Sequence, residues 1–196
     1  MNRDIIIQEM RDYAKKYQVP IITDDGLDFL LNYIKENNIK KILEVGTAIG
    51  YSAICMCNID DSITVTSIER DNDRYSLAVQ NVSKSNLNDR ITLIYGDALE
   101  VDVKGDFDLI FIDAAKAQNI KFFEKYEVLL NTNGTIITDN MNFHGLVNKK
   151  VEEIESRNLR QLVRKVNKYK EFLINNSNYD TKFLDIGDGL AVSIKK

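Results

Sequence analysis

Short apolar runs alternate with amphipathic stretches over most of this chain. Residues 4–17 and 24–37 have helical spacing, and Thr23 or Asp24 is placed to cap the second stretch. Further on, we expect strands at Lys41–Val45, Ile63–Ile68, Ile91–Tyr95, Phe107–Ile112 and Thr135–Thr138, separated by helices near 50–58, 72–85 and 117–130. Strands that are apolar throughout and alternate with helices predict a parallel sheet covered on both faces.

The C-terminal part of the chain follows a different pattern. Residues 147–176 form one long polar stretch with helical spacing, and two strands are expected at Tyr179–Ile186 and Leu190–Ile194. Gly187-Asp188-Gly189 joins these strands, and its Asp-Gly pair favours a tight turn between antiparallel partners. The chain therefore predicts an α/β fold with a doubly wound seven-stranded sheet, mostly parallel, that ends in a C-terminal antiparallel hairpin.

Composition narrows the class of protein. The 196 residues are 44% hydrophobic and 29% charged, which predicts one globular domain over residues 1–196. We expect no membrane span, because no run of about 18 apolar residues occurs, and the N-terminus lacks the apolar centre of a signal peptide. Cys55 and Cys57 point to different sides of a predicted helix and cannot pair with each other. A cytoplasmic protein without disulfides is therefore expected.

The net charge of −4 is unevenly distributed. Residues 149–170 hold eight bases and three acids, so this stretch carries +5 and the rest of the chain −9. The bases are Lys149, Lys150, Arg157, Arg160, Arg164, Lys165, Lys168 and Lys170. Such a stretch can steer a polyanion to one face of an acidic protein, although a solvated helix face gives the same pattern.

A glycine turn and three acids follow the expected strands. Gly46 and Gly50 permit a tight strand-to-helix turn and the close approach of a ligand, although such a turn often only packs a helix against a strand. Glu44, Glu69 and Asp97 lie at the carboxyl ends of successive strands, where open α/β sheets bind ligands. Each could be a plain surface carboxylate, but together they favour a nucleoside pocket, with Glu69 placed to accept hydrogen bonds from a ribose.

This arrangement resembles the S-adenosylmethionine-dependent methyltransferases with a Rossmann-like sheet. The resemblance implies methionine-chain contacts near Glu44 and Gly46, the ribose on Glu69, and the adenine near Asp97 and Ala98. It also implies that helices in residues 1–38 cover the cofactor pocket. The implied cofactor-binding set is Ile21, Glu44, Gly46, Tyr51, Ser52, Glu69, Asp97, Ala98 and Asp113.

Two further strand ends carry candidate metal ligands. Asp113 follows one strand, and Asp139 and Asn140 follow its expected neighbour, so their side chains should converge at one edge of the sheet. Two carboxylates and an amide oxygen are hard ligands that suit Mg²⁺, Mn²⁺ or Ca²⁺. The absence of a Cys/His cluster argues against zinc. Asp139 as a helix cap and Asn140 as a turn residue remain the structural alternatives.

The D-A-A-K sequence at 113–116 and the T-D-N sequence at 138–140 resemble the cation-dependent O-methyltransferases that act on catechols and caffeoyl-CoA. The resemblance implies that Asp113, Asp139 and Asn140 bind the metal and that Lys116 and Asp113 are the catalytic residues, with Lys116 as the base. Metal coordination lowers the pKa of a phenol-like hydroxyl, and a lysine near a cation can accept the proton. A simple salt bridge is the alternative for Lys116, and the lone His144 stays outside the catalytic set.

The substrate is suggested by the basic stretch. Residues 156–165 and the ending Gly187–Val192 resemble the bacterial tRNA 5-hydroxyuridine methyltransferases, which form 5-methoxyuridine at the wobble position. This resemblance implies a tRNA anticodon loop as partner, a homodimer, and RNA contacts at Arg157, Arg160, Arg164 and Lys165. The alternative substrates are small catechols or related phenols. A third hypothesis, a module that binds the cofactor without catalysis, is disfavoured by the intact set of Asp113, Lys116, Asp139 and Asn140.

Overall fold

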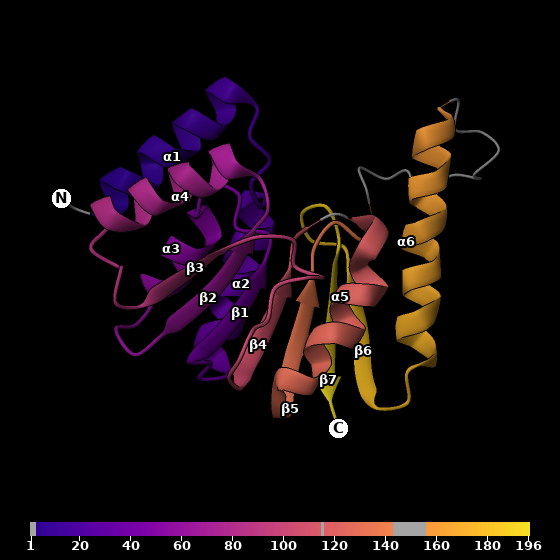
Figure 1. The fold of residues 1–196 in the computed structure, drawn as a ribbon. Helices are drawn as coiled ribbons and strands as arrows, with labels where there is room; N and C mark the ends of the chain where they lie inside the picture. The colour runs from indigo at the N-terminus through magenta and orange to yellow at the C-terminus, as the bar shows by residue number, and fades with distance from the viewer. Residues whose placement is uncertain (1–2, 115, 143–155) are drawn as a thin grey trace.

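A seven-stranded sheet organises the protein in the computed structural model, which describes residues 3–114, 116–142 and 156–196. The strand order is β3-β2-β1-β4-β5-β7-β6 (Figure 1). The strands are β1 (Lys41–Val45), β2 (Thr64–Glu69), β3 (Ile91–Tyr95), β4 (Phe107–Ile112), β5 (Leu130–Thr138), β6 (Tyr179–Leu184) and β7 (Leu190–Lys195). The pairs among β1 to β5 are parallel, and β7 is antiparallel to both β5 and β6. The predicted fold class is confirmed.

Helices cover both faces of this sheet. The helices are α1 (Arg3–Tyr17), α2 (Asp24–Glu36), α3 (Tyr51–Cys57), α4 (Asn72–Lys84), α5 (Asn119–Tyr126) and α6 (Arg157–Asn175), with short 3₁₀ turns η1 (Lys116–Gln118) and η2 (Glu127–Leu129). Along β4, Leu109 and Phe111 enter one hydrophobic core with α1 to α4, whereas Ile110 and Ile112 enter a second core with α5 and α6. This alternation explains why a strand buried on both faces is apolar throughout.

Aromatic packing attaches α6 to the second core. Phe123 of α5 is fully buried, and its ring meets Tyr169 and Phe172 of α6 and Tyr179 of β6, at centroid distances of 6.5, 5.4 and 4.9 Å. Ser156 caps the helix by accepting a hydrogen bond from the backbone N–H of Leu159. The expected helix over 147–176 is therefore observed as α6, while residues 147–155 lie outside the described residues.

Two local expectations need correction. The expected helix over 117–130 is divided into η1, α5 and η2, and β5 begins at Leu130 rather than at Thr135, with a register shift against β4. The β6–β7 connection is also longer than a tight turn, because Leu184 pairs with Leu190 and leaves residues 185–189 as a five-residue loop. This loop folds back on the rest of the fold: Asp188 and Gly189 carbonyls accept hydrogen bonds from the backbone of residues 142 and 141.

In the described part of the chain, none of the helices combines the length and apolar character needed to span a membrane.

Candidate functional site

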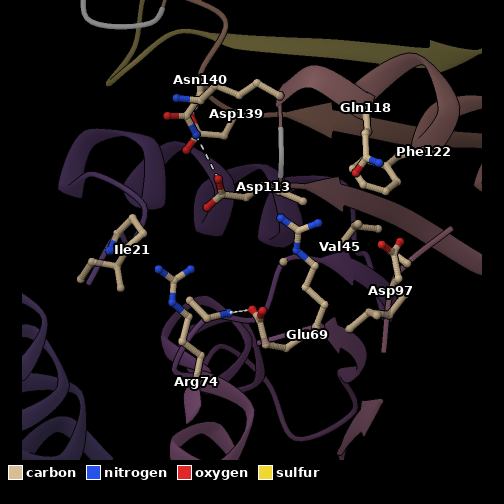
Figure 2. Close-up of a pocket in the computed structure, with 18 of the residues that line it drawn as sticks. Ile21, Val45, Glu69, Arg74, Asp97, Asp113, Gln118, Phe122, Asp139 and Asn140 are labelled. Atoms are coloured by element: carbon tan, nitrogen blue, oxygen red, sulfur yellow. Dashed lines mark hydrogen bonds between the residues drawn. The ribbon is translucent and has the colours of Figure 1, made fainter. Parts of the chain in front are cut away.

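A cavity of about 550 Å³ opens at the carboxyl ends of β1 to β5 (Figure 2). Its wall is built from the connections that follow these strands, together with the α1–α2 connection and the β6–β7 loop. This is the crevice in which an open α/β sheet binds ligands. Nine residues predicted from the sequence line it: Ile21, Gly46, Glu69, Asp97, Ala98, Asp113, Lys116, Asp139 and Asn140.

The glycine turn brings two strand ends into close contact. Gly46 has a φ of +109°, and its backbone N–H donates to the carbonyl of Ile68 in β2. A Cβ at this position would lie 2.0 Å from the carbonyl oxygen of Asp113. Glycine is therefore needed at residue 46 both for its backbone angle and for the space beside β4.

Glu44 lies beneath this turn, away from the cavity wall. Its carboxylate is fully buried and accepts hydrogen bonds from the hydroxyls of Ser52 and Ser67. Burial raises the pKa of Glu44 to about 7. Tyr51 is also buried, and its hydroxyl accepts a hydrogen bond from Arg11 Nε at 2.5 Å. The structure thus places Glu44, Tyr51 and Ser52 behind the wall rather than on it.

Glu69 and Asp97 organise the backbone on the β2–β3 side of the cavity. Glu69 accepts hydrogen bonds from the backbone N–H of Ala48 at 2.7 Å and of Asp71 at 2.9 Å. Asp97 accepts one from Leu99 at 2.8 Å. Both carboxylates line the cavity and hold the turns that follow β2 and β3, an arrangement suited to a polar ligand edge.

Asp113, Asp139 and Asn140 meet on another side of the cavity, as Figure 2 shows. Ile112 and Thr138 are register partners in β4 and β5, so the following aspartates emerge side by side. Asn140 Nδ2 donates to Asp113 Oδ1 at 3.0 Å, and the Asn140 backbone N–H donates to Asp139 Oδ1 at 2.6 Å. A φ of +66° at Asn140 turns the chain sharply enough to bring its amide back toward Asp113.

The electrostatics of this group fit a divalent cation. Burial, together with nearby carboxylates, raises the pKa of Asp113 to about 6 and that of Asp139 to about 7. A cation bound by these side chains would offset their mutual repulsion and favour their ionised forms. The described residues contain no group of three or more His, Cys, Asp or Glu side chains placed for a metal. The candidate set is instead two carboxylates and one amide, a hard oxygen set.

Lys116 lies in η1 and faces the same cavity. Its Nζ is 4.0 Å from Asp188 Oδ2, and burial lowers the pKa of the lysine despite three surrounding carboxylates. Asp188 belongs to the β6–β7 loop and lines the cavity. Sequence reasoning assigned Asp188 only to a turn, because nothing in the pattern shows that the loop folds toward η1. The cavity also takes in Arg70, Arg74 and Phe122, which sequence reasoning missed.

The basic helix α6 packs against η1, the turn that carries Lys116. Arg157, Arg164 and Lys165 are exposed, and Arg160 is half-buried. None of these four residues lines the cavity, but the element that bears them touches part of its wall. Basic side chains of α6 are therefore exposed on a helix that contacts one part of the cavity wall.

Comparisons with known proteins agree on one family. The sequence model of the family described as O-methyltransferase matches residues 2–196. A caffeoyl-CoA O-methyltransferase from Populus kitakamiensis is 28% identical over 201 residues, covering 95% of this chain and 84% of that protein. The crystal structure of a Staphylococcus aureus protein, provisionally named caffeoyl-CoA O-methyltransferase, is 45% identical with a TM-score of 0.92, covering 97% of this chain and 92% of that one.

A more distant structure shares the fold alone. The O-methyltransferase from Bacillus cereus, solved as a complex with SAH, is 24% identical with a TM-score of 0.83. The match covers 97% of this chain and 90% of that one.

Proposed function

The chain belongs to the O-methyltransferase family, and we propose that it transfers a methyl group from S-adenosylmethionine to a metal-activated, phenol-like hydroxyl. The observation that carries this proposal is the meeting of Asp113, Asp139 and Asn140 with Lys116 in one cavity, beside the polar wall of Glu69 and Asp97. This chemistry needs a site for the nucleoside of the cofactor and a cluster of hard oxygen ligands for the metal. Both sets of side chains lie in the same cavity.

In the proposed cofactor site, Glu69 accepts hydrogen bonds from the ribose hydroxyls. Asp97 and Ala98 lie at the adenine edge, and Gly46 leaves room for the methionine chain to approach the backbone. Ile21, from the α1–α2 connection, covers the cofactor from the side of the N-terminal helices. Glu44 and Ser52 support the glycine turn from below, consistent with the hydrogen bond between them. S-adenosylmethionine supplies an electrophilic methyl group on a sulfonium.

In the proposed catalytic step, Lys116 accepts the proton of the substrate hydroxyl at Nζ. Its lowered pKa supports this role, because a larger fraction of the lysine is then neutral and able to act as a base. Asp113, Asp139 and Asn140 would hold the divalent cation, Mg²⁺ or a similar ion. When bound, the cation lowers the pKa of the hydroxyl and fixes its position. The groups of the wall would orient the nucleophile toward the methyl group.

As substrate we propose 5-hydroxyuridine at the tRNA wobble position, which becomes 5-methoxyuridine. Two features support it: the base carries a phenol-like hydroxyl, and α6 presents Arg157, Arg164 and Lys165 to solvent from a helix packed on η1. An anticodon loop is single-stranded and can present an unstacked base to a cavity.

Small phenols are the second candidate substrates, and the comparisons favour them. Both the Populus protein and the Staphylococcus protein bear the name of a caffeoyl-CoA O-methyltransferase. The same side chains would carry out the same reaction on a catechol. The homodimer and the cytoplasmic location remain predictions from the sequence.

One assay separates the two substrate classes. The protein is incubated with methyl-labelled S-adenosylmethionine and Mg²⁺, and offered an anticodon stem-loop RNA with 5-hydroxyuridine, caffeoyl-CoA, or a catechol. We expect label on the RNA, loss of turnover in a chelator, and loss of turnover with retained cofactor binding in Asp139→Ala. Label only on the small molecules would refute the RNA substrate. Full turnover in a chelator would refute the requirement for a divalent metal.

A pair of triple variants tests whether the basic helix α6 contacts RNA. Replacing Arg157, Arg160 and Arg164 with alanine should weaken RNA binding at least about tenfold near physiological salt and flatten its salt dependence, because phosphate contacts are lost. The control removes the same charge from α1 and α2, with Lys15, Lys16 and Lys35 replaced by alanine. Equal effects of the two triple variants would show that only net charge matters, and that α6 does not contact RNA.

A further inference from the structure

Two tyrosine rings lie beside the cavity, and the proposed reaction uses neither. Tyr95 ends β3 and is 53% exposed, and Tyr75 lies at the start of α4. Their ring centroids are 5.3 Å apart, with the planes at 51°. Tyr95 directly precedes Gly96, and Tyr75 directly follows Arg74, and both of those neighbours line the cavity. The pair therefore adjoins the cavity wall in the chain without lining the cavity, a position called the rim below, and Tyr95 is exposed to solvent there.

The strand register explains this position. Tyr95 is the register partner of Glu69 in the parallel ladder of β2 and β3. Partners in such a ladder point to the same face of the sheet from strands about 4.8 Å apart. The ring of Tyr95 therefore leaves the sheet beside the carboxylate proposed to hold the ribose.

Two arginines are close neighbours of the tyrosine pair in the chain: Arg74 directly precedes Tyr75, and Arg70 directly follows Glu69, the register partner of Tyr95. Arg70 and Arg74 both line the cavity, and within the described residues neither guanidinium lies within 4.0 Å of a carboxylate oxygen. Asp71, between them in sequence, accepts hydrogen bonds from the backbone N–H groups of Asp73 and Arg74 and caps α4; these hydrogen bonds and the charges of Arg74 and Arg70 lower the pKa of Asp71. Two cations that share one carboxylate without a close ion pair, near an exposed aromatic ring, match a ligand with a flat ring and an anionic group.

We propose that Tyr95, Tyr75, Arg70 and Arg74 bind a nucleotide that flanks the methylated base in a single-stranded RNA. The flanking base stacks on the ring of Tyr95, and an adjacent phosphate pairs with the arginines. Every base offers an aromatic face, and guanidinium groups pair with phosphate oxygens in a forked geometry. This inference rests on the proposed RNA substrate.

The rim formed by these four residues is separate from the basic helix. The sheet order places β3 at one edge and β6, with α6 beside it, toward the other (Figure 1). The RNA would thus be held on both sides of the cavity: by phosphate contacts at α6 and by base stacking at β3. Phosphate contacts at α6 would position the RNA, and stacking at β3 would hold the base next to the reacting one.

The test compares four variants of the full chain. Binding of an anticodon stem-loop RNA with 5-hydroxyuridine is measured by fluorescence anisotropy, and cofactor binding by calorimetry. Tyr95→Leu should weaken RNA binding by roughly 5- to 150-fold, the range for loss of one base–aromatic stack. Its effect should fall on the KM for RNA more than on kcat. Tyr95→Phe keeps the ring and should bind RNA as the unmodified protein does.

Tyr17→Leu is the matched control, because Tyr17 is 55% exposed and pairs with the ring of Tyr13 on α1. It should bind RNA normally. In Arg74→Gln, the slope of log affinity against log salt should fall by about 0.7, the value for one contact with a single strand.

The possible outcomes distinguish a failure of this inference from a failure of the proposed function. If the protein methylates the stem-loop RNA and Tyr95→Leu binds it normally, the inference is wrong and the RNA substrate stands. If the protein binds no RNA and methylates only small phenols, both are wrong. If Tyr95→Leu changes self-association in ultracentrifugation instead of RNA affinity, the rim is a protein contact and the inference is again wrong.

Discussion

Substituting Gly46 with alanine tests the close approach between the glycine turn and β4. The added Cβ would lie 2.0 Å from the Asp113 carbonyl oxygen and 2.7 Å from its carbonyl carbon, both backbone atoms. Backbone cannot rotate out of the way as a side chain can. The strand end must therefore move by more than about 1 Å to restore ordinary contact, and the hydrogen bond from the Asp113 N–H to the Val45 carbonyl lies in its path.

The magnitude follows from three contributions. A φ of +109° strains any residue with a Cβ by about 1–3 kcal/mol. Overpacking against fixed atoms adds about 1–3 kcal/mol, and a weakened backbone hydrogen bond adds about 0.5–1.5 kcal/mol. The lower entropy of the unfolded alanine chain offsets about 0.4–1 kcal/mol of this. Gly46→Ala should therefore reduce the free energy of unfolding by about 2–7 kcal/mol, a large part of the total for one domain.

Gly105→Ala is the control that isolates the contact. Gly105 has a φ of +124°, but a Cβ there would meet only the ring of Phe107, at 3.8 Å. It carries the backbone strain without the clash, so we expect a loss of only about 1–3 kcal/mol. Both variants are compared by urea unfolding with the unmodified protein. If the two losses agree within about 0.5 kcal/mol, the close approach has no energetic consequence and the reasoning is refuted.

Three further predictions concern the cores. Phe123→Ala should cost about 3–5 kcal/mol in urea unfolding because a fully buried ring is lost, whereas the more exposed Phe183→Ala should cost less than about 1 kcal/mol. The pKa of Glu44 is raised from 4.5 to about 7 by burial, so the folded state retains a proton that the unfolded chain releases, and stability falls as pH rises through this window. Glu44→Gln should flatten that slope in pH-dependent unfolding, and an unaltered slope would contradict the assignment. Burial raises the pKa of Cys55 and Cys57 to about 12, so alkylation near pH 8 should require denaturant; rapid labelling of the native protein would count against it.

Much of the fold was predictable because it depends on local pattern. The bounds of β1, β3 and β4 match the expected strands, since each apolar run ends at polar residues or glycine. The interior strands β1 and β4 are buried on both faces, whereas β3 lies at the edge of the sheet and is only partly buried. The convergence of Asp113 with Asp139 was predictable for the same reason: parallel strands end at one edge of the sheet, and the following residues share that edge. Helical spacing also predicted α6, which buries Val163 and Val166 and leaves Leu159 and Leu162 half-buried.

Side-chain direction was decided by tertiary packing. Glu44 and Glu69 are both acids at strand ends, yet Glu44 points beneath the glycine turn to two serine hydroxyls, whereas Glu69 faces the cavity. The pattern around each residue is nearly the same, so nothing local separates a structural acid from a binding one. The difference arises from which backbone N–H and hydroxyl groups the neighbouring elements bring within reach.

The sequence by itself determined the order of strands and helices along the chain, which of their residues are buried, and the edge of the sheet at which the polar residues gather. Only the tertiary structure placed Asp188 beside Lys116 and paired the ring of Tyr95 with that of Tyr75. Periodicity reports which face of its own element a residue occupies, whereas a site is made of contacts between elements far apart in the chain. Those contacts depend on how loops fold back and how deeply side chains pack, and the cooperative burial of the whole core settles both.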